Sequence, residues 1–573
     1  MAKFTTSPGV ALSEIDNTFL TGQPVQAGAA IIGPTVKGPV EKPTLVTSYS
    51  DFQMLFGDSF ISGGNAYSYL TSIAAYNYFN YGGTSLLVAR VVSSSYTPAT
   101  SSFVSASTHA AGSPYNSNVF ELETISEGLI ANSNDLTGSN NILLSGSKNN
   151  VRWEITNSNT GSGTFNVLVR RGNDTENNKV ILETWNNVNL DPNSSRFITQ
   201  VIGNQKLNYN AATNQMELSG SYPNNSKYIR VKKVNQTTPN FFDANGVAVP
   251  SYTGSIPLNG SGSFGGAIGT VHNSSAINFY ENINTQTQGL VGSDYDNMIA
   301  LLGNPESYQF NLLFTPGLLD DTHTSQITNI ITNTIARGDN MFVVDLVSYG
   351  NNVSSTITQA QTRNTSYAAA YWPWVRIIDP STGKHVWVPA STVVPGVYAF
   401  NDKVSAPWFA PAGINRGGLS TVLQAELKLT QGNRDNLYAS NINPIATLPK
   451  QGVVVYGQKT LQKEQSALDR VNVRRLMIEL KNYIRQIANT IVFEQNTIQT
   501  RTSFLAKVNP YLEAIQQKQG LYAFKVIMDN SNNGPAIIDQ NQLVGQIYVQ
   551  PTRTAEFISL DFILLPTGAK FPG

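Results

Sequence analysis

The sequence predicts a multidomain protein of mixed α/β class, with α+β and α/β units in one chain and an extended arm at each end. Three observations support this prediction. Segments near both ends alternate apolar strands with amphipathic helices, the segment 93–290 contains only short stretches of alternating apolar and polar residues, and both termini contain helix-breaking glycine and proline. The 573 residues are enough to bury several hydrophobic cores.

The composition excludes several functional classes. Charged residues make up only 13% of the chain, and 37 basic residues balance 37 acidic ones. This balance argues against a surface that as a whole binds nucleic acid or anionic lipid. Because so few residues are charged, copies of the chain repel one another little, which favours their packing together. The absence of cysteine excludes disulfides and thiolate sites. With no secretory leader pattern and no run of 18 apolar residues, we expect no membrane insertion.

The N-terminal part of the chain divides into an arm and a compact segment. Residues 1–26 predict an extended arm, because glycine and proline interrupt any helix and the apolar residues are too few to form a core. Residues 27–92 predict a compact unit with strands at 29–34 and 84–92 and helices at 50–57 and 65–81.

The segment 93–290 predicts an inserted β-rich domain or domains, because serine, threonine, asparagine and glycine dominate and the helical pattern disappears. The strand-like stretches begin at Val119, Val151, Phe165, Val180 and Tyr228. Each stretch alternates apolar and polar residues, as expected for a strand with one solvated face.

The C-terminal half returns to strand–helix alternation. Residues 291–440 predict a middle α/β unit with parallel strands, and residues 441–565 predict a C-terminal unit. Within the latter we expect a long helix at 468–491, two shorter helical pieces that meet near Pro510, and three strands at 521–528, 543–549 and 556–565. We expect residues 566–573 to form a second arm.

The helix predicted at 468–491 has two different faces. Its apolar face is expected to pack on the protein's own core. Beside that face lies a basic stripe of four residues, Arg470, Arg474, Lys481 and Arg485. Such a stripe is either an ordinary solvated face, or a set of ion pairs within the subunit, or a contact with an acidic partner surface.

Candidate cofactor and metal motifs are weak. The G-x-G-x-x-G match at Gly260 lacks the flanking strand and helix, and the near phosphate-loop match at Gly452 carries an extra residue before its lysine. The acidic residues Asp320, Asp321 and Asp345 follow predicted strands and could hold a divalent metal, although turns and helix caps are the commoner use of such residues. We expect no cofactor.

Six blocks of the sequence carry a further signal: Ser7-Pro-Gly-Val near the N-terminus, and the blocks at 27–57, 78–91, 452–461, 471–477 and 492–497. These blocks resemble contractile tail sheath proteins of bacteriophages. The resemblance is strong over 27–92 and 440–573 and moderate over 291–440. Within 93–290 it extends only to a general β-rich character.

This resemblance implies a virion protein that is assembled in the host cytoplasm. Its copies would stack as hexameric rings around a tail tube and contract to drive the tube through the host envelope for genome ejection. The N- and C-terminal arms would add strands to the sheet of an adjacent copy. The implied arm residues are Ser7, Pro8, Gly9, Val10, Leu12 and Ile15 at one end and Ile558, Leu560, Phe562, Leu564 and Phe571 at the other.

The resemblance also implies an arrangement and a set of partners. An inner α/β domain would come from the chain's two ends, with a middle α/β layer, and the β-rich insertion would lie outward. The basic stripe would face the tail tube protein, and baseplate and tail terminator proteins would be further partners, without direct nucleic-acid contact or enzymatic activity.

Other functions remain open at this stage. The nearest alternative is the sheath of a phage-derived bacteriocin or of another contractile injection system. A distant one is an α/β metal-dependent hydrolase that uses Asp320, Asp321 and Asp345. A carbohydrate-binding module would use Trp153 and Trp185 of the β-rich insertion.

Overall fold

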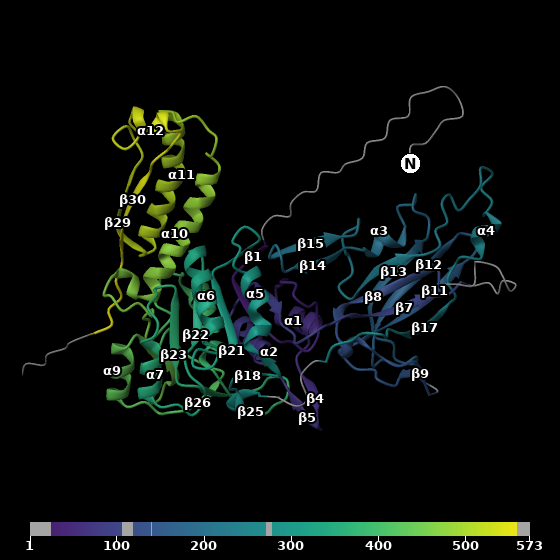
Figure 1. Ribbon diagram of the computed structural model, residues 1–573, viewed down its shortest axis with the longest axis horizontal. Coiled ribbons are helices and arrows are strands. Elements are labelled where there is room, and N and C mark those ends of the chain that lie inside the picture. Colours follow the sequence, from purple (N-terminus) through teal and green to yellow (C-terminus); the bar gives the residue numbers. More distant parts are fainter. Residues whose placement is uncertain (1–24, 106–117, 139, 271–277, 558–573) are drawn as a thin grey trace, which may run out of the picture.

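The computed structural model describes residues 25–105, 118–138, 140–270 and 278–557. The chain has three parts (Figure 1). A central sheet flanked by helices and a β-rich insertion lie side by side along the horizontal axis of the view, and a helical pair with a β-hairpin lies above the central part. Among the described helices, none is long and apolar enough to cross a membrane.

The central sheet has eight strands in the order β28-β27-β23-β22-β21-β2-β6-β3. Its six inner strands, β27 to β6, pair in parallel, and the two edge strands β28 and β3 pair antiparallel. The strands are β2 Ala29–Gly33, β3 Thr44–Val46, β6 Leu86–Arg90, β21 Leu312–Leu319, β22 Met341–Asp345, β23 Ala368–Trp372, β27 Ile442–Leu448 and β28 Gly452–Val455. Strands β2, β6, β21, β22 and β23 are buried along their whole length, which explains their continuous apolar runs.

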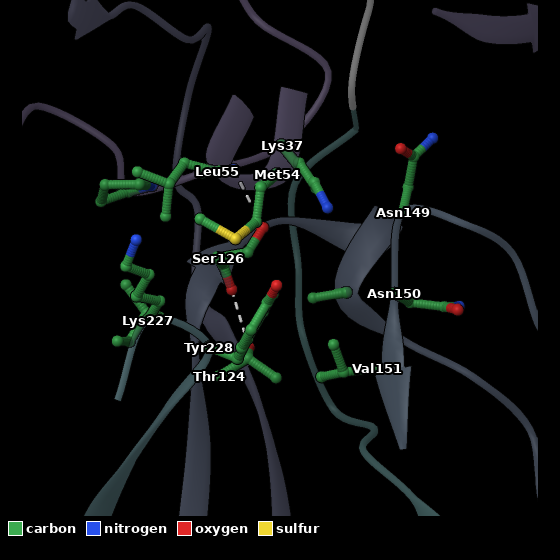
Figure 2. A pocket seen from close by; sticks show the side chains of 14 residues that line it. Lys37, Met54, Leu55, Thr124, Ser126, Asn149, Asn150, Val151, Lys227 and Tyr228 are labelled. Atoms are coloured by element: carbon green, nitrogen blue, oxygen red, sulfur yellow. Dashed lines mark hydrogen bonds between the residues drawn. The ribbon is translucent and has the colours of Figure 1, made fainter. Parts of the chain in front are cut away.

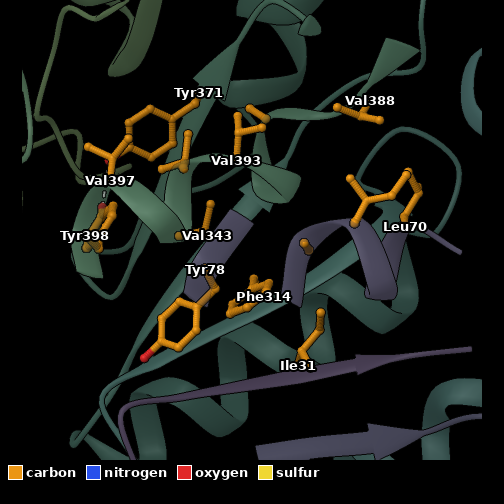
Figure 3. Close-up of a cluster of buried hydrophobic side chains, with 14 of the residues drawn as sticks. Ile31, Leu70, Tyr78, Phe314, Val343, Tyr371, Val388, Val393, Val397 and Tyr398 are labelled. Atoms are coloured by element: carbon orange, nitrogen blue, oxygen red, sulfur yellow. Dashed lines mark hydrogen bonds between the residues drawn. The ribbon is translucent and has the colours of Figure 1, made fainter. Parts of the chain in front are cut away.

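Helices cover both faces of this sheet and produce two hydrophobic clusters. One cluster packs α2 and α8 against the sheet around Phe314 and Tyr371 (Figure 3), and the other packs α5 and α6 around Phe342. The helices of this part are α1 Tyr49–Phe56, α2 Leu70–Asn80, α5 Asp296–Leu301, α6 Thr324–Arg337, α7 Val353–Ala360, α8 Val394–Val404 and α9 Gln431–Ala439. Smaller strands around the sheet are β1 Val25–Ala27 with β20 Tyr308–Phe310, β4 Phe60–Ser62 with β5 Asn65–Tyr67, β18 Gln286–Thr287 with β19 Leu290–Val291, and β24 Val375–Ile378 with β25 His385–Val388 and β26 Val422–Ala425.

The sheet corrects the expected arrangement of the α/β parts. From the sequence we expect an inner domain from the chain's two ends and a separate middle layer. In the structure, the strands of 27–92 and those of 312–455 form one sheet, joined by the parallel pairing of β2 with β21. The reason is that β2 and β6 are apolar on both faces, so they are buried best in the middle of a sheet whose two faces are covered.

In the structure the insertion consists mainly of strands. Its sheets run in the orders β13-β12-β11-β17 and β16-β8-β7 and share one core, in which the Phe103 and Phe120 rings stack 4.4 Å apart. The elements are β7 Pro98–Phe103, β8 Phe120–Glu127, β9 Leu136–Thr137, β10 Ile142–Leu143, β11 Val151–Asn159, β12 Thr164–Arg171, β13 Ile181–Asn189, α3 Ile198–Ile202, β14 Lys206–Asn210, β15 Gln215–Ser219, β16 Ile229–Val234, α4 Pro250–Thr253 and β17 Gly260–Ser263.

A buried ion-pair network crosses the insertion. Arg170 on β12 is fully buried and binds Asp174 through Nε at 2.8 Å and Nη2 at 3.0 Å. Asp174 also accepts from Arg152 at 3.3 Å, and Arg170 reaches Glu154 at 2.9 Å. Buried guanidinium groups of this kind are tolerated only while their carboxylate partners remain.

We therefore predict that Asp174→Ala lowers the local stability of the insertion by about 3–5 kcal/mol, because two buried guanidinium groups lose their shared partner. Hydrogen–deuterium exchange of the β11–β13 amides measures this change. Lys179→Ala is the matched control, since Lys179 is partly exposed in the same network and its loss should cost less than about 1 kcal/mol. Equal effects of the two variants would contradict the assignment.

Candidate subunit-interaction surfaces

The C-terminal unit is a helical pair covered by a hairpin. Helix α10, Val471–Asn489, is followed by α11, Ile498–Gln517, and the strands β29, Leu521–Ile527, and β30, Gln546–Pro551, pair antiparallel beside them (Figure 1). The short helix α12, Pro535–Asp539, lies between the two strands in sequence. The two helical pieces predicted near Pro510 are a single helix, because Pro510 is accommodated inside α11.

Helix α10 joins this unit to the central sheet. Val471 and Ile478 belong to the sheet's hydrophobic cluster, whereas Leu480 and Ile487 belong to the core of the C-terminal unit. Buried Arg475 forms a two-pronged contact with Asp402 of α8, at 2.7 and 2.6 Å. A single helix therefore contributes to two cores.

The structure corrects the basic stripe. Arg474 is 5% exposed, lies 4.1 Å from the Tyr367 ring and donates to the Ser366 hydroxyl, so it cannot face a tube. Arg470 is held within the subunit by an ion pair with Glu556, at 2.8 Å. A helical projection alone does not reveal these contacts. The side of α10 that carries Arg470 and Arg474 faces other parts of the same subunit.

Lys481 and Arg485 are the exposed members of the stripe, and they lie at a groove. The groove has a volume of about 280 Å³ between α10 and β30. Its lining is otherwise apolar and consists of Met477, Leu480, Ile484, Ile547 and Val549. Within the described residues, β29 and β30 pair only with each other, so each strand has one unpaired edge.

The segment that follows β30 is held to the subunit by hydrogen bonds at Glu556, close to the last described residue. The Glu556 carboxylate accepts hydrogen bonds from Tyr438 at 2.7 Å, Arg470 at 2.8 Å and Gln458 at 3.0 Å. Phe557, the next residue, is 83% exposed. The root of the C-terminal arm is therefore fixed to the body of the subunit.

The arm residues themselves lie outside the described residues. This applies to Ser7, Pro8, Gly9, Val10, Leu12 and Ile15 at one end and to Ile558, Leu560, Phe562, Leu564 and Phe571 at the other. The strand predicted at 556–565 also falls largely beyond them, and its first residues, 556 and 557, are not in a strand.

The three aspartates considered for a metal each have partners inside the subunit. These are Arg363 for Asp320, Ser348 for Asp321 and Ser391 for Asp345. Burial raises the pKa of the Asp345 carboxyl to about 7, although Ser391 donates two hydrogen bonds to it. Among the residues that the structure describes, no group of three or more acidic or histidine side chains is arranged to hold a metal ion.

The remaining motifs are structural. Gly260 and Gly452 begin the strands β17 and β28, so neither opens a phosphate-binding loop before a helix. Trp153 donates from its indole nitrogen to the Ser263 carbonyl at 3.1 Å, and the Trp153 and Trp185 rings pack against the core of the insertion. They form no exposed aromatic platform of the kind a sugar would need.

A small cavity marks the junction between the central part and the insertion (Figure 2). It has a volume of about 30 Å³, with Lys37 and Met54 on one side and Thr124, Ser126 and Tyr228 on the other. Burial lowers the pKa of the Lys37 ammonium to about 8. Because sites for organic ligands are roughly ten times larger, this cavity is a packing feature of the junction.

Comparison with known proteins identifies two domains in the chain. Residues 288–461 match the central domain of phage tail sheath proteins, and residues 463–564 match the phage tail sheath C-terminal domain. The tail sheath proteins of Vibrio phage KVP40 and Enterobacteria phage T4 are each 39% identical to the chain, over 208 and 185 residues. These alignments cover 36% and 32% of the chain and 31% and 28% of the relatives, so the matched region spans about a third of their length.

A solved structure is similar to this chain in fold over most of its length. The sheath tail protein of Listeria innocua is 10% identical and superposes over 92% of this chain and 95% of its own, with a TM-score of 0.52. The chain is therefore similar to phage tail sheath proteins in two of their domains, at residues 288–461 and 463–564.

Proposed function

We propose that the protein is the structural subunit of a contractile phage tail sheath. Its copies stack as hexameric rings around a tail tube and contract to drive the tube through the host envelope for genome ejection. The observation that carries this proposal is the two-stranded sheet β29–β30, which lies within the region matching the sheath C-terminal domain. Among the residues that the structure describes, each of its two strands has one unpaired edge. A two-stranded sheet with free edges is an incomplete structure that extra strands would complete.

The arms are the proposed source of those strands. Both arms are apolar enough to bind a sheet and too short to form a core of their own. Strand addition satisfies the backbone groups of the arm and of the receiving edge together. Two arms and two edges in each subunit give a mesh in which every copy is linked to more than one neighbour.

The proposed partners are further copies of the chain, the tail tube protein, and baseplate and tail terminator proteins, in a virion assembled in the host cytoplasm. We propose no direct contact with nucleic acid. The sheath of a phage-derived bacteriocin or of another contractile injection system fits the same surfaces, and a DNA-filled head on the particle would distinguish the phage. We further propose six regions, at 1–26, 27–92, 93–290, 291–440, 441–565 and 566–573, with the insertion facing outward.

Deletion of residues 1–20 should leave a folded subunit that forms no tubes, because the cores described above are built from residues that begin at Ala29. Negative-stain electron microscopy at high protein concentration, with and without the tube protein, measures assembly. Circular dichroism and thermal unfolding should match those of the full chain. Normal tubes from the shortened protein would refute the role of the N-terminal arm.

We propose that the subunit is structural rather than catalytic, since Asp320, Asp321 and Asp345 are each engaged within the fold. Titration with Mg²⁺ or Mn²⁺ in a calorimeter should therefore give no binding heat above the heat of dilution. The Asp321→Asn variant is the control, because Asp321 is the member of the three nearest to solvent. Saturable heat that this substitution removes would revive the metal-site hypothesis.

A further inference from the structure

A lysine is buried without a partner at the junction between the central part and the β-rich insertion. Lys37 lies between β2 and β3 and is only 7% exposed. Within the part of the chain that the structure describes, its ammonium group has neither a hydrogen bond nor an ion pair. The carboxylate of Asp58 attracts it, but that carboxylate is already paired with Lys148 at 2.6 Å. A buried cation in this situation is costly, because nothing replaces the water that it has lost.

Lys37 is one of the residues that line the cavity of about 30 Å³ (Figure 2). Its amino group extends into this space from the central part, and the hydroxyl group of Tyr228 points toward the same space from the insertion. Two lysines, Lys37 and Lys227, line the cavity, and no carboxylate is found among the described residues of the lining. The space left by the packing of the two parts is therefore surrounded by positive charge.

Hydroxyl groups around the cavity have hydrogens to donate. The Ser126 hydroxyl accepts a hydrogen bond from the Gly38 amide at 3.0 Å, and its own hydrogen has no acceptor among the described residues. The Tyr228 hydroxyl likewise has no hydrogen-bond partner in the described part of the chain. The Thr124 hydroxyl differs, because it already donates to the Ser126 carbonyl at 2.7 Å. One cation and two hydroxyl donors around a small space are the groups that bind an anion.

The size and the charge of the cavity limit the kind of anion. One buried water molecule needs roughly 10–15 Å³ of such space, so a cavity of about 30 Å³ has room for one small ion and none for an organic acid. A water molecule would fill the space but would leave the charge of Lys37 uncompensated. Although burial lowers the pKa of Lys37 to about 8, most of its amino groups carry a proton at neutral pH. A halide such as chloride meets both conditions.

We infer that this cavity binds a small monovalent anion of the halide class, held by the ammonium group of Lys37 and the hydroxyl groups of Ser126 and Tyr228. Lys37 belongs to the central part and the two hydroxyl groups belong to the insertion. The anion therefore links the two parts of one subunit and stabilises their junction. This inference is independent of the proposed function, since it concerns a site within a single copy.

Chloride NMR tests the binding directly. Exchange of chloride with the purified protein should broaden the chloride resonance, and added bromide should reverse the broadening by competing for the same site. Hydrogen–deuterium exchange tests the link between the two parts. Chloride at ten times its Kd should slow the exchange of the amides at 36–40 and 124–128 about tenfold relative to gluconate at the same ionic strength, because gluconate is too large for the cavity.

Three variants locate the site. Lys37→Met retains the length of the side chain without its charge, and it should abolish both responses to chloride. Tyr228→Phe should raise the Kd of chloride about fivefold, because one hydrogen bond to the anion is lost. Lys227→Met is the matched control: Lys227 lines the same cavity, but its side chain is 57% exposed and pairs with Asp51 at 3.3 Å, so both responses should remain.

Three results would overturn the inference. Equal exchange in chloride and gluconate, without saturable broadening, would mean that the cavity holds only water. A full response to chloride in Lys37→Met would place the anion elsewhere, and loss of the response in Lys227→Met alone would place it on the surface. If Lys37→Met did not fold, an unchanged Kd in Tyr228→Phe would decide against the site.

Discussion

The pairing of β2 with β21 is the contact on which the rest of the structure depends. Ala30 lies opposite Leu313 and Ile31 opposite Phe314, in strands that are completely buried. The whole β-rich insertion lies between these strands in sequence, so the pairing closes a very long loop. The entropic cost of closure grows only with the logarithm of loop length, and two fully buried strands offset it. Arg90, at the end of β6, then fastens the insertion to the sheet by donating to the Glu127 carbonyl at 3.1 Å.

Helix α10 extends this rigid body to the C-terminal unit. Because α10 contributes to two hydrophobic cores and holds Asp402 through Arg475, the C-terminal unit cannot rotate on the sheet without breaking buried contacts. Movement of one copy relative to another must therefore be accommodated outside this body. In the proposed function, the arms take that role, and the bonds of Glu556 keep the origin of the C-terminal arm fixed.

The parts predicted correctly from the sequence are those with a strong local pattern. The alternating strands of the insertion and helices such as α1 and α10 have apolar residues at the period of their secondary structure, so they are recognised without knowledge of their neighbours. The position of β2 in the sheet depends on a partner nearly three hundred residues away, which no local pattern contains. Arg474 was misassigned for the same reason: a helical projection shows the direction of a side chain and not the ring of Tyr367 that covers it. The arm residues remain predictions. The edges of β29 and β30 that have no partner within the described part of the chain became visible only in the structure.

Strand addition alone would leave a sheath of this kind poorly specified. Backbone hydrogen bonds between strands are the same at every register, and a shift of one residue turns every side chain of the added strand to the opposite face. With only 13% charged residues, the chain has few charges available to penalise such a shift. Two of them, Lys481 and Arg485, are exposed at the rim of the apolar groove between α10 and β30. Apolar side chains that alternate along an added strand would therefore have to set most of its register, because a shift of one residue would turn them from the core to the solvent.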